Sequence, residues 1–305
     1  MRTINLIVLI FAACGLACQN KPGVVAMTSS DKIIDTIHSR ILNEDRYIWL
    51  HVPATARNTS KKYPVVFLFD AEANFEATKN ILDNLRKEPA FKSAGDVILV
   101  GIGNIWLRYR DYSPTHVDPS QWMDAPTAKT TGGGEKFVSF IEKELLPYIE
   151  KKYPVSSVRT LVGHSMGGLM VMNILLKHKE LFDNYIAIDP SMWWDNNKLL
   201  HESVSILGSQ SFDNKKLFLA IANEQDKKMT TDQIRKDTSA KTFMIRPSFL
   251  LVSHIEKNKQ NGLRFQWKFY KDDHHMTVNT PATFDALKTI FPSAAGLAPL
   301  PVQHN

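Results

Sequence analysis

The segment Gly163-His164-Ser165-Met166-Gly167 limits what this chain can fold into more than any other part of the sequence. It follows an apolar run at 159–165 that is typical of a buried strand, and it precedes a helical pattern at 167–177. A G-x-S-x-G motif between a strand and a helix is typical of a sharp turn that exposes a serine hydroxyl above a sheet. A tight turn with a capping serine is the alternative, but such turns seldom need both glycines. The motif therefore predicts an α/β architecture with Ser165 as a nucleophile.

Strand and helix patterns alternate along most of the chain. A hairpin pattern covers 33–54, with Asn43-Glu44 at its turn. Buried-strand runs follow at 63–70, 96–103, 159–165, 184–190, 216–223 and 263–270. Helical periodicity occurs at 73–87, 135–152, 167–177, 240–261 and 281–290. Repeated β-α-β units predict a mostly parallel central sheet with helices on both faces, preceded by an antiparallel hairpin. We expect one domain over 33–292 and a C-terminal tail at 293–305.

The N-terminal segment has the pattern of an export signal. Residues 1–18 carry Arg2 near a positive start and then a short apolar run, which is too short to span a bilayer. Cys18 follows a small residue, as at a bacterial lipoprotein processing site, and we expect it to be lipidated. Lipidation at Cys14 and ordinary cleavage after Ala17 are the alternatives. Residues 19–32 are polar and predict a tether, so the expected location is the periplasm or, through a lipid anchor, a bacterial membrane.

Composition excludes several classes of protein. Of 305 residues, 44% are apolar and 22% are charged, which is typical of a globular domain and not of disordered, collagen-like or disulfide-rich chains. The 37 basic and 31 acidic residues give a formal charge of +6. No nucleic-acid-binding motif accompanies this mild excess, so we expect no nucleic-acid partner.

A serine nucleophile needs a base, and the pair His274-His275 is placed to supply one. The pair follows the strand pattern at 263–270 and precedes the last helix, so it lies on a loop at the carboxyl edge of the sheet. A histidine pair also suits a metal site, but no cysteine or carboxylate cluster at zinc spacing accompanies this one. We therefore expect no metal.

The acid of a triad is expected after the strand pattern at 216–223. Asn223 stands where glycine is common, and Asn tolerates the left-handed conformation. The spacing then favours Asp226, with Glu224 as the rival, and a site that works with serine and histidine alone is a third possibility.

An oxyanion hole needs two main-chain N–H groups. We expect Met166 to supply one, from the start of the helix after the serine. Ala71 or Glu72, which follow the strand pattern at 63–70, is expected to supply the other.

Several segments together resemble the Putative esterase family, which is similar to esterase D, bacterial siderophore esterases and feruloyl or acetyl-xylan esterases. They are VVFLFDAEANF, RYRDYSPTH, GGGEKFVSFIEKELLPYIEKKYP, RTLVGHSMGGL, LFDNYIAIDPSMWWD and DDHHMTV, and they span about residues 33–291. The resemblance implies an α/β-hydrolase fold. Members end in a segment like His-Gly-Ser-Val, which His275-Met276-Thr277-Val278 matches, so the resemblance selects His275 over His274. The family often has Leu-Asp-Gly where this chain has Phe69-Asp70-Ala71, which is a departure at the oxyanion hole.

The resemblance also implies a substrate pocket near the nucleophile. Trp193 and Trp194 follow the strand pattern at 184–190, and the family uses such residues to wall its pocket. One of the two is equally well explained as a core residue. Arg108, Arg110 and Tyr112 lie in the long loop 104–134 and suit an anionic or aromatic substrate, whereas a solvated salt-bridged loop is the competing interpretation.

The sequence thus predicts an exported serine carboxylic-ester hydrolase that acts through an acyl-enzyme and needs no cofactor. The expected substrate is a siderophore-type ester or an acyl ester of a polysaccharide. A non-catalytic surface binding protein on a hydrolase scaffold and an acyltransferase are the alternatives.

Overall fold

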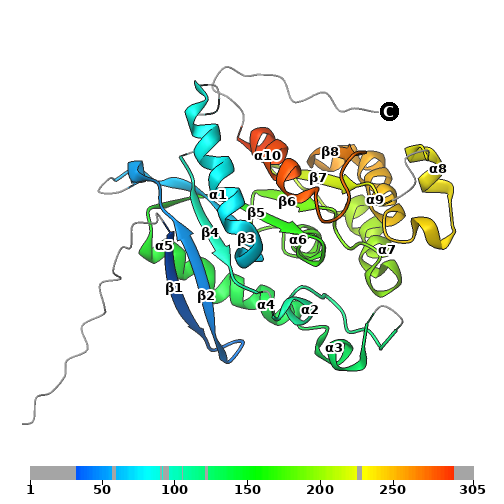
Figure 1. Cartoon of the computed structure of the whole chain (residues 1–305), viewed down its shortest axis with the longest axis horizontal. Helices are drawn as coiled ribbons and strands as arrows, with labels where there is room; N and C mark the ends of the chain where they lie inside the picture. Colours follow the sequence, from blue (N-terminus) through cyan, green and yellow to red (C-terminus); the bar gives the residue numbers. More distant parts are fainter. Residues whose placement is uncertain are drawn as a thin grey trace, which may run out of the picture.

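The structure is a computed structural model that describes residues 32–56, 60–89, 91, 96–104, 106–120, 123–224 and 229–291. One eight-stranded sheet runs through it, with helices on both faces (Figure 1). The predicted signal peptide lies outside the described residues. The predicted tether up to residue 31 and the predicted C-terminal tail also lie outside the described residues.

The sheet has the order β1-β2-β4-β3-β5-β6-β7-β8. Its strands are β1 (Lys32–Ser39), β2 (Glu44–His51), β3 (Tyr63–Phe69), β4 (Ile98–Ile102), β5 (Val155–His164), β6 (Asn184–Ile188), β7 (Lys216–Ala222) and β8 (Arg264–Tyr270). β1, β2 and β4 pair antiparallel, and every other neighbouring pair is parallel. The predicted mostly parallel sheet with an N-terminal antiparallel hairpin is confirmed.

Helices connect the strands. The α-helices are α1 (Ala71–Lys87), α2 (Arg108–Asp111), α3 (Ala125–Thr130), α4 (Gly134–Phe140), α5 (Leu146–Lys152), α6 (Met166–Lys177), α7 (Trp194–Ser209), α8 (Thr231–Lys236), α9 (Arg246–Lys257) and α10 (Asn279–Ile290). The short helices are η1 (Ala54–Ala56), η4 (Ala240–Thr242) and η5 (Lys259–Asn261), and the π-helix η3 (Ile141–Leu145) joins α4 to α5. Because the crossovers return over the sheet, the carboxyl ends of β3 to β7 lie at one edge.

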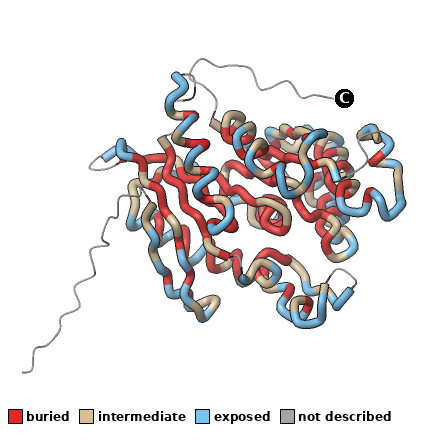
Figure 2. The backbone as a smooth tube through the Cα atoms, in the orientation of Figure 1, coloured by how far each residue is buried: buried red, intermediate tan, exposed pale blue. Residues whose placement is uncertain are grey.

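The strands separate two apolar cores. Along β3, Phe67 and Phe69 face a core that α4, α6, α7 and α9 complete, whereas Val66 and Leu68 face a core completed by α1 and α10. Burial is concentrated in the central strands and in α6 (Figure 2). Strands covered on both faces need apolar side chains at every position, which is why they appear in the sequence as continuous apolar runs.

Several helices differ from the sequence expectation. The helix predicted over 240–261 is a short turn, η4, followed by α9, which begins next to Pro247 because proline favours the first turn of a helix. The helix predicted over 135–152 contains the π segment η3 just before Pro147, whose missing N–H interrupts regular α-helical bonding. Sequence patterns did not predict α7 or α8.

A buried ion cluster fixes α2 against the hairpin. The guanidinium of Arg46, only 2% exposed, lies 2.7 Å from the carboxylate of Asp111 and 2.7 Å from the amide oxygen of Asn104. Arg110 bonds the other oxygen of Asp111 at 2.6 Å and also pairs with Glu44 of β2. The cluster therefore ties β2 to the loop that follows β4.

We expect Asp111→Ala to lower the free energy of unfolding by about 3–5 kcal/mol, because it leaves Arg46 buried without its main counter-ion. Urea denaturation monitored by circular dichroism measures this. The control is Asp45→Ala, which removes an exposed ion pair with His38 and is expected to change stability by less than about 0.5 kcal/mol. Equal effects of the two substitutions would contradict the importance of the cluster.

Candidate active site

Ser165 occupies the turn between β5 and α6 in a strained conformation. Its φ of 60° and ψ of −120° lie in a region that side chains rarely adopt. A Cβ atom at Gly163 would overlap the carbonyl of Gly167, so the strand and helix approach closely only because Gly163 has no side chain. The strand-turn-helix context predicted for the motif is present, and it exposes the serine hydroxyl at the carboxyl edge of the sheet.

The structure brings Ser165, His275 and Asp189 together in a line. His275 Nε2 lies 3.0 Å from Ser165 Oγ, and His275 Nδ1 lies 2.5 Å from Asp189 Oδ2. Since a carboxylate can only accept, Nδ1 carries the proton and Nε2 is free to accept one from the serine. This is the arrangement of nucleophile, base and orienting acid that serine hydrolases use. The neighbouring His274 is exposed and is no part of it.

The acid of this arrangement differs from the one predicted. Asp226 lies outside the described residues, and the position on His275 Nδ1 is taken by Asp189. The rival Glu224 accepts a hydrogen bond from the main-chain N–H of His275, not from its ring. The sequence prediction considered only carboxylates after the 216–223 strand, whereas Asp189 directly follows β6, the strand that pairs with β5. Considering every carboxylate at a strand end after Ser165 would have included it.

The surroundings of His275 favour its protonated form. Burial alone lowers the pKa of His275, but the hydrogen bond and charge of Asp189, helped by the charge of Glu224, outweigh burial and raise that pKa above its ordinary value. A raised pKa makes the imidazole a better proton acceptor. Its imidazolium form is stabilised at the same time.

The amides that were predicted to hold the oxyanion lie at the starts of two helices. In α6 the first intrahelical bond runs from Leu169 N–H to the carbonyl of Ser165, so the Met166 amide has no helical acceptor. In α1 the first such bonds are donated by Ala73 and Asn74. The amides of residues 71 and 72, the predicted Ala71 and Glu72 donors, therefore also precede the helical bonding pattern at this sheet edge.

The structure places the two predicted arginines of the loop after β4 in different surroundings. The guanidinium of Arg110 is paired with Glu44 and Asp111, which agrees with the competing interpretation of a salt-bridged loop. Arg108 instead lies at the site, where its Nε donates to Asp70 Oδ1 at 2.8 Å. Burial raises the pKa of Asp70 despite that ion pair. The charge of Arg108 lowers the pKa of His164 and opposes the rise in the pKa of His275.

Of the two predicted pocket tryptophans, only Trp193 borders the site. It lines a narrow cavity next to Asp189 and His275, together with Met244. Trp194 is 4% exposed and donates its indole N–H to the carbonyl of Thr115 at 3.2 Å. The structure therefore favours the alternative that Trp194 is a core residue, because its ring is buried and its indole N–H is bonded there.

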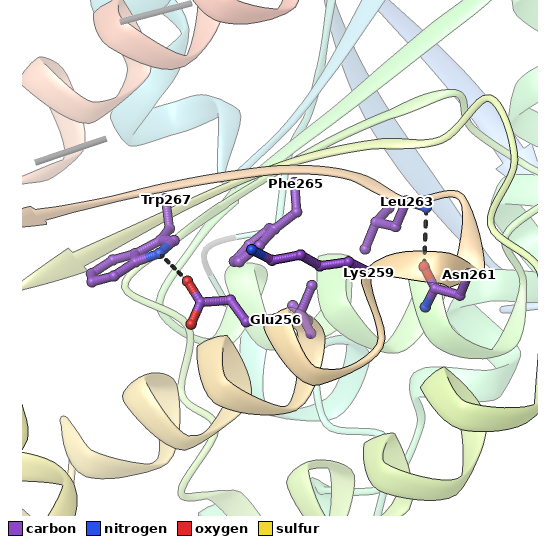
Figure 3. Close-up of a pocket in the computed structure, with 7 residues that line it drawn as sticks. Glu256, Lys259, Asn261, Leu263, Phe265 and Trp267 are labelled. Carbon is purple, nitrogen blue, oxygen red and sulfur yellow. Dashed lines mark hydrogen bonds between the residues drawn. The ribbon is translucent and has the colours of Figure 1, made fainter. Parts of the chain in front are cut away.

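A roomier cavity of about 330 Å³ lies between α9 and β8 (Figure 3). Phe265 and Trp267 of β8 form part of its wall, and Glu256 of α9 accepts a hydrogen bond from the indole N–H of Trp267 at 3.3 Å. None of its lining residues belongs to the arrangement around Ser165. The chemistry is therefore not located at this cavity.

The described ranges contain neither a metal cluster nor a membrane-spanning helix. No group of three or more histidine, cysteine, aspartate or glutamate side chains is arranged to hold a metal ion there. No helix in the same part of the chain is both long and apolar enough to cross a bilayer.

Comparisons with known proteins agree with this geometry. The sequence profile described as Putative esterase matches residues 39–283. Ferri-bacillibactin esterase BesA of Bacillus subtilis is 28% identical over 272 residues, covering 83% of this chain and 87% of the relative. The siderophore enterobactin esterase of Emericella nidulans is 32% identical over 158 residues, covering 48% of this chain and 52% of the relative.

A solved structure extends the agreement to the fold. The IroE-like serine hydrolase of Shewanella oneidensis superimposes with a TM-score of 0.76 at 30% identity, covering 85% of this chain and 80% of that one. With a profile match over most of its length and Ser165 at the elbow of an α/β-hydrolase fold, the chain belongs to the Putative esterase family and is a serine esterase.

Proposed function

We propose that this esterase is an exported enzyme that hydrolyses a siderophore-type ester through a Ser165-His275-Asp189 triad and an acyl-enzyme. The observation that carries the mechanism is the continuous chain of contacts from Asp189 Oδ2 through the imidazole to Ser165 Oγ. This arrangement matches the roles that acyl transfer requires of nucleophile, base and acid.

In the acylation half of the reaction, Ser165 Oγ attacks the ester carbonyl while His275 Nε2 accepts its proton. The imidazolium formed is stabilised by Asp189. The oxyanion is held by the Met166 amide and by an amide at the start of α1. His275 then gives the proton to the leaving alcohol, which departs as the carbonyl re-forms.

In the deacylation half, a water molecule takes the place of the alcohol. His275 accepts a proton from this water, whose oxygen attacks the acyl-enzyme and produces a second oxyanion in the same hole. Collapse of this intermediate returns the proton to Ser165 and releases the acid. No step needs a metal or organic cofactor.

Relatives and charge support a siderophore-type substrate. Two matched relatives are named for the hydrolysis of siderophores. The net charge of +6 and the charge of Arg108, which is paired with Asp70 and still acts on His275, suit an anionic ferric complex. A solved structure of a ferulic acid esterase is only 19% identical in sequence to this chain, so it bears on the fold alone. A polysaccharide ester is therefore less supported as the substrate.

We also propose that residues 1–18 direct export and that Cys18 carries a lipid, because a short apolar run ends there in a small residue before cysteine. We expect Cys18→Ser to move the protein from the membrane fraction to the soluble fraction of a bacterial host. Cys14→Ser serves as the matched control and should leave it in the membrane fraction. The reverse result would place the lipid on Cys14.

We expect Ser165→Ala to lower kcat/KM for p-nitrophenyl acetate by about 10³-fold or more, because no other group replaces the nucleophile. Ser205→Ala, on the exposed face of α7, is the control and should behave as wild type. A wild type that is inert to esters and to a fluorophosphonate probe would favour a non-catalytic binding protein. Transfer of acyl groups to added alcohols in preference to water would favour an acyltransferase.

Ferric enterobactin and ferric bacillibactin are then compared with feruloyl and acetyl sugars, and we expect the ferric siderophores to give the higher kcat/KM.

We expect kcat/KM of the wild type to rise with pH through a midpoint above the ordinary histidine value of 6.5, because His275 must be neutral to accept a proton and its pKa is raised. Asp189→Asn removes the charge that raises this pKa, so the midpoint moves to lower pH. The plateau should fall about 10³- to 10⁴-fold because the tautomer is lost. The measurement is the pH–rate profile of Asp189→Asn beside that of the wild type. Asp232→Asn, at an exposed position on α8, is the matched control and should keep the wild-type profile. An unchanged profile for Asp189→Asn would contradict its role as the acid.

A further inference from the structure

The catalytic histidine lies in a hydrogen-bonded turn between a strand and a helix. His275 is located between the end of β8 at Tyr270 and the start of α10 at Asn279. No strand ladder or helix bonds its peptide groups, so other contacts must fix its main chain. The main chain of His275 must be fixed in place to keep Nε2 within hydrogen-bond distance of Ser165 Oγ. A displacement of the imidazole by about 1 Å is enough to lose much of the rate.

The N–H group of His275 is bonded by a side chain from the end of β7. It donates to the carboxylate of Glu224, which follows β7 by two residues. Asn223 strengthens the same connection, because its main-chain N–H donates to the carbonyl of Asp273 at 2.8 Å and its side chain donates to the carbonyl of Lys271 at 2.9 Å. The end of β7 therefore holds the segment that carries His275.

The carbonyl group of His275 is bonded by a side chain from β5. Nε2 of His164 lies 2.9 Å from this oxygen. Because a carbonyl only accepts, His164 Nε2 must carry the proton. The two imidazole rings lie with centroids 4.5 Å apart. His164 thus contacts both the main chain and the ring of the catalytic histidine, although the reaction itself does not use it.

His164 is also kept neutral. Burial and the nearby His275 lower its pKa to about 4, and Arg108 acts in the same direction, whereas Asp189 opposes them. At any pH where His275 acts as a base, His164 is therefore an uncharged donor. A charged ring at this position would oppose the imidazolium that His275 forms during the reaction.

We propose that His164 and Glu224 are positioning residues that clamp the main chain of His275 from its two sides. Three neighbouring strands then hold one catalytic residue, because β5 supplies His164, β6 supplies Asp189 for the ring and β7 supplies Glu224. The inference rests on the proposed function, since it assigns the clamp to the same triad. It also gives the two carboxylates different roles, because Asp189 orients the ring through Nδ1, whereas Glu224 accepts a hydrogen bond from the main chain. The charges of both raise the pKa of His275.

The test compares variants that lose each hydrogen bond with variants that keep it. His164→Leu removes the donor and Glu224→Ala removes the acceptor, and we expect each to lower kcat about 10- to 100-fold with little change in KM. In both variants the hydrogen bond between Asp189 and the His275 ring loosens, which lowers the pKa of His275. The low-pH limb of kcat/KM therefore shifts to lower pH. His164→Gln and Glu224→Gln keep a donor and an acceptor, and they should restore kcat to within about threefold. His164→Gln should also return the pH limb, whereas Glu224→Gln keeps the part of the shift that comes from the lost charge of Glu224. A variant that had merely lost folded protein would show neither the shift nor this rescue.

A second measurement does not depend on ester turnover. In NMR spectra of the same full-length variants, the Nδ1 proton of His275 reports its bond to Asp189. We expect its low-field signal in the wild type and in the glutamine variants, and its loss or upfield shift in His164→Leu and Glu224→Ala. An unchanged signal in His164→Leu and Glu224→Ala would overturn the clamp, whether or not the wild type hydrolyses esters. A wild type that hydrolyses no ester would count only against the proposed function. A loss of activity in Glu224→Gln as large as that in Asp189→Asn would also overturn it, because Glu224 would then act through its charge.

Discussion

The strained turn at Ser165 is the constraint on which the rest of the site depends. A φ of 60° at a serine is unfavourable by itself, so the neighbouring packing must hold it in place. That packing is the close approach of β5 to α6, which Gly163 permits, together with a helix whose residues are almost all buried. Because α6 is buried next to Ser165, the Met166 amide at its start has a fixed place beside the serine, as the proposed role in holding the oxyanion requires.

Given a fixed serine, the remaining groups come from the ends of neighbouring parallel strands. Strand pairing places the residues after β5, β6 and β7 side by side, which brings Asp189 and Glu224 close to the histidine loop. In such a sheet, several strand ends can supply the acid, and small changes in loop conformation decide which one does. Here Asp189 adopts a φ of 41°, which Asp tolerates better than most residues, and its carboxylate meets the ring of His275.

Sequence patterns were sufficient where the physical signal is local. The continuous apolar runs, the hairpin and the glycines around Ser165 each follow from nearby residues, and the structure has the expected elements there. Such patterns can include Asp189 among the candidates for the acid but cannot select it, because Asp189 and Glu224 differ in tertiary geometry and not in local sequence character. The same holds for Arg110 and Trp194, whose partners Glu44 and Thr115 are 66 and 79 residues away along the chain. α7 was missed because its first turn is irregular, with positive φ at Asp195, Asn196 and Asn197.

The placement of Glu224 has a further physical consequence. A carboxylate on the main chain of His275 raises the pKa of the ring by charge alone, without competing with Asp189 for Nδ1. The catalytic base thus has two anions near it, of which one fixes its tautomer and the other fixes its backbone. Neutral His164 on the opposite side completes the hydrogen bonding without adding a positive charge that would cancel this effect. The basicity of His275 and its position are therefore set by the same three strand ends.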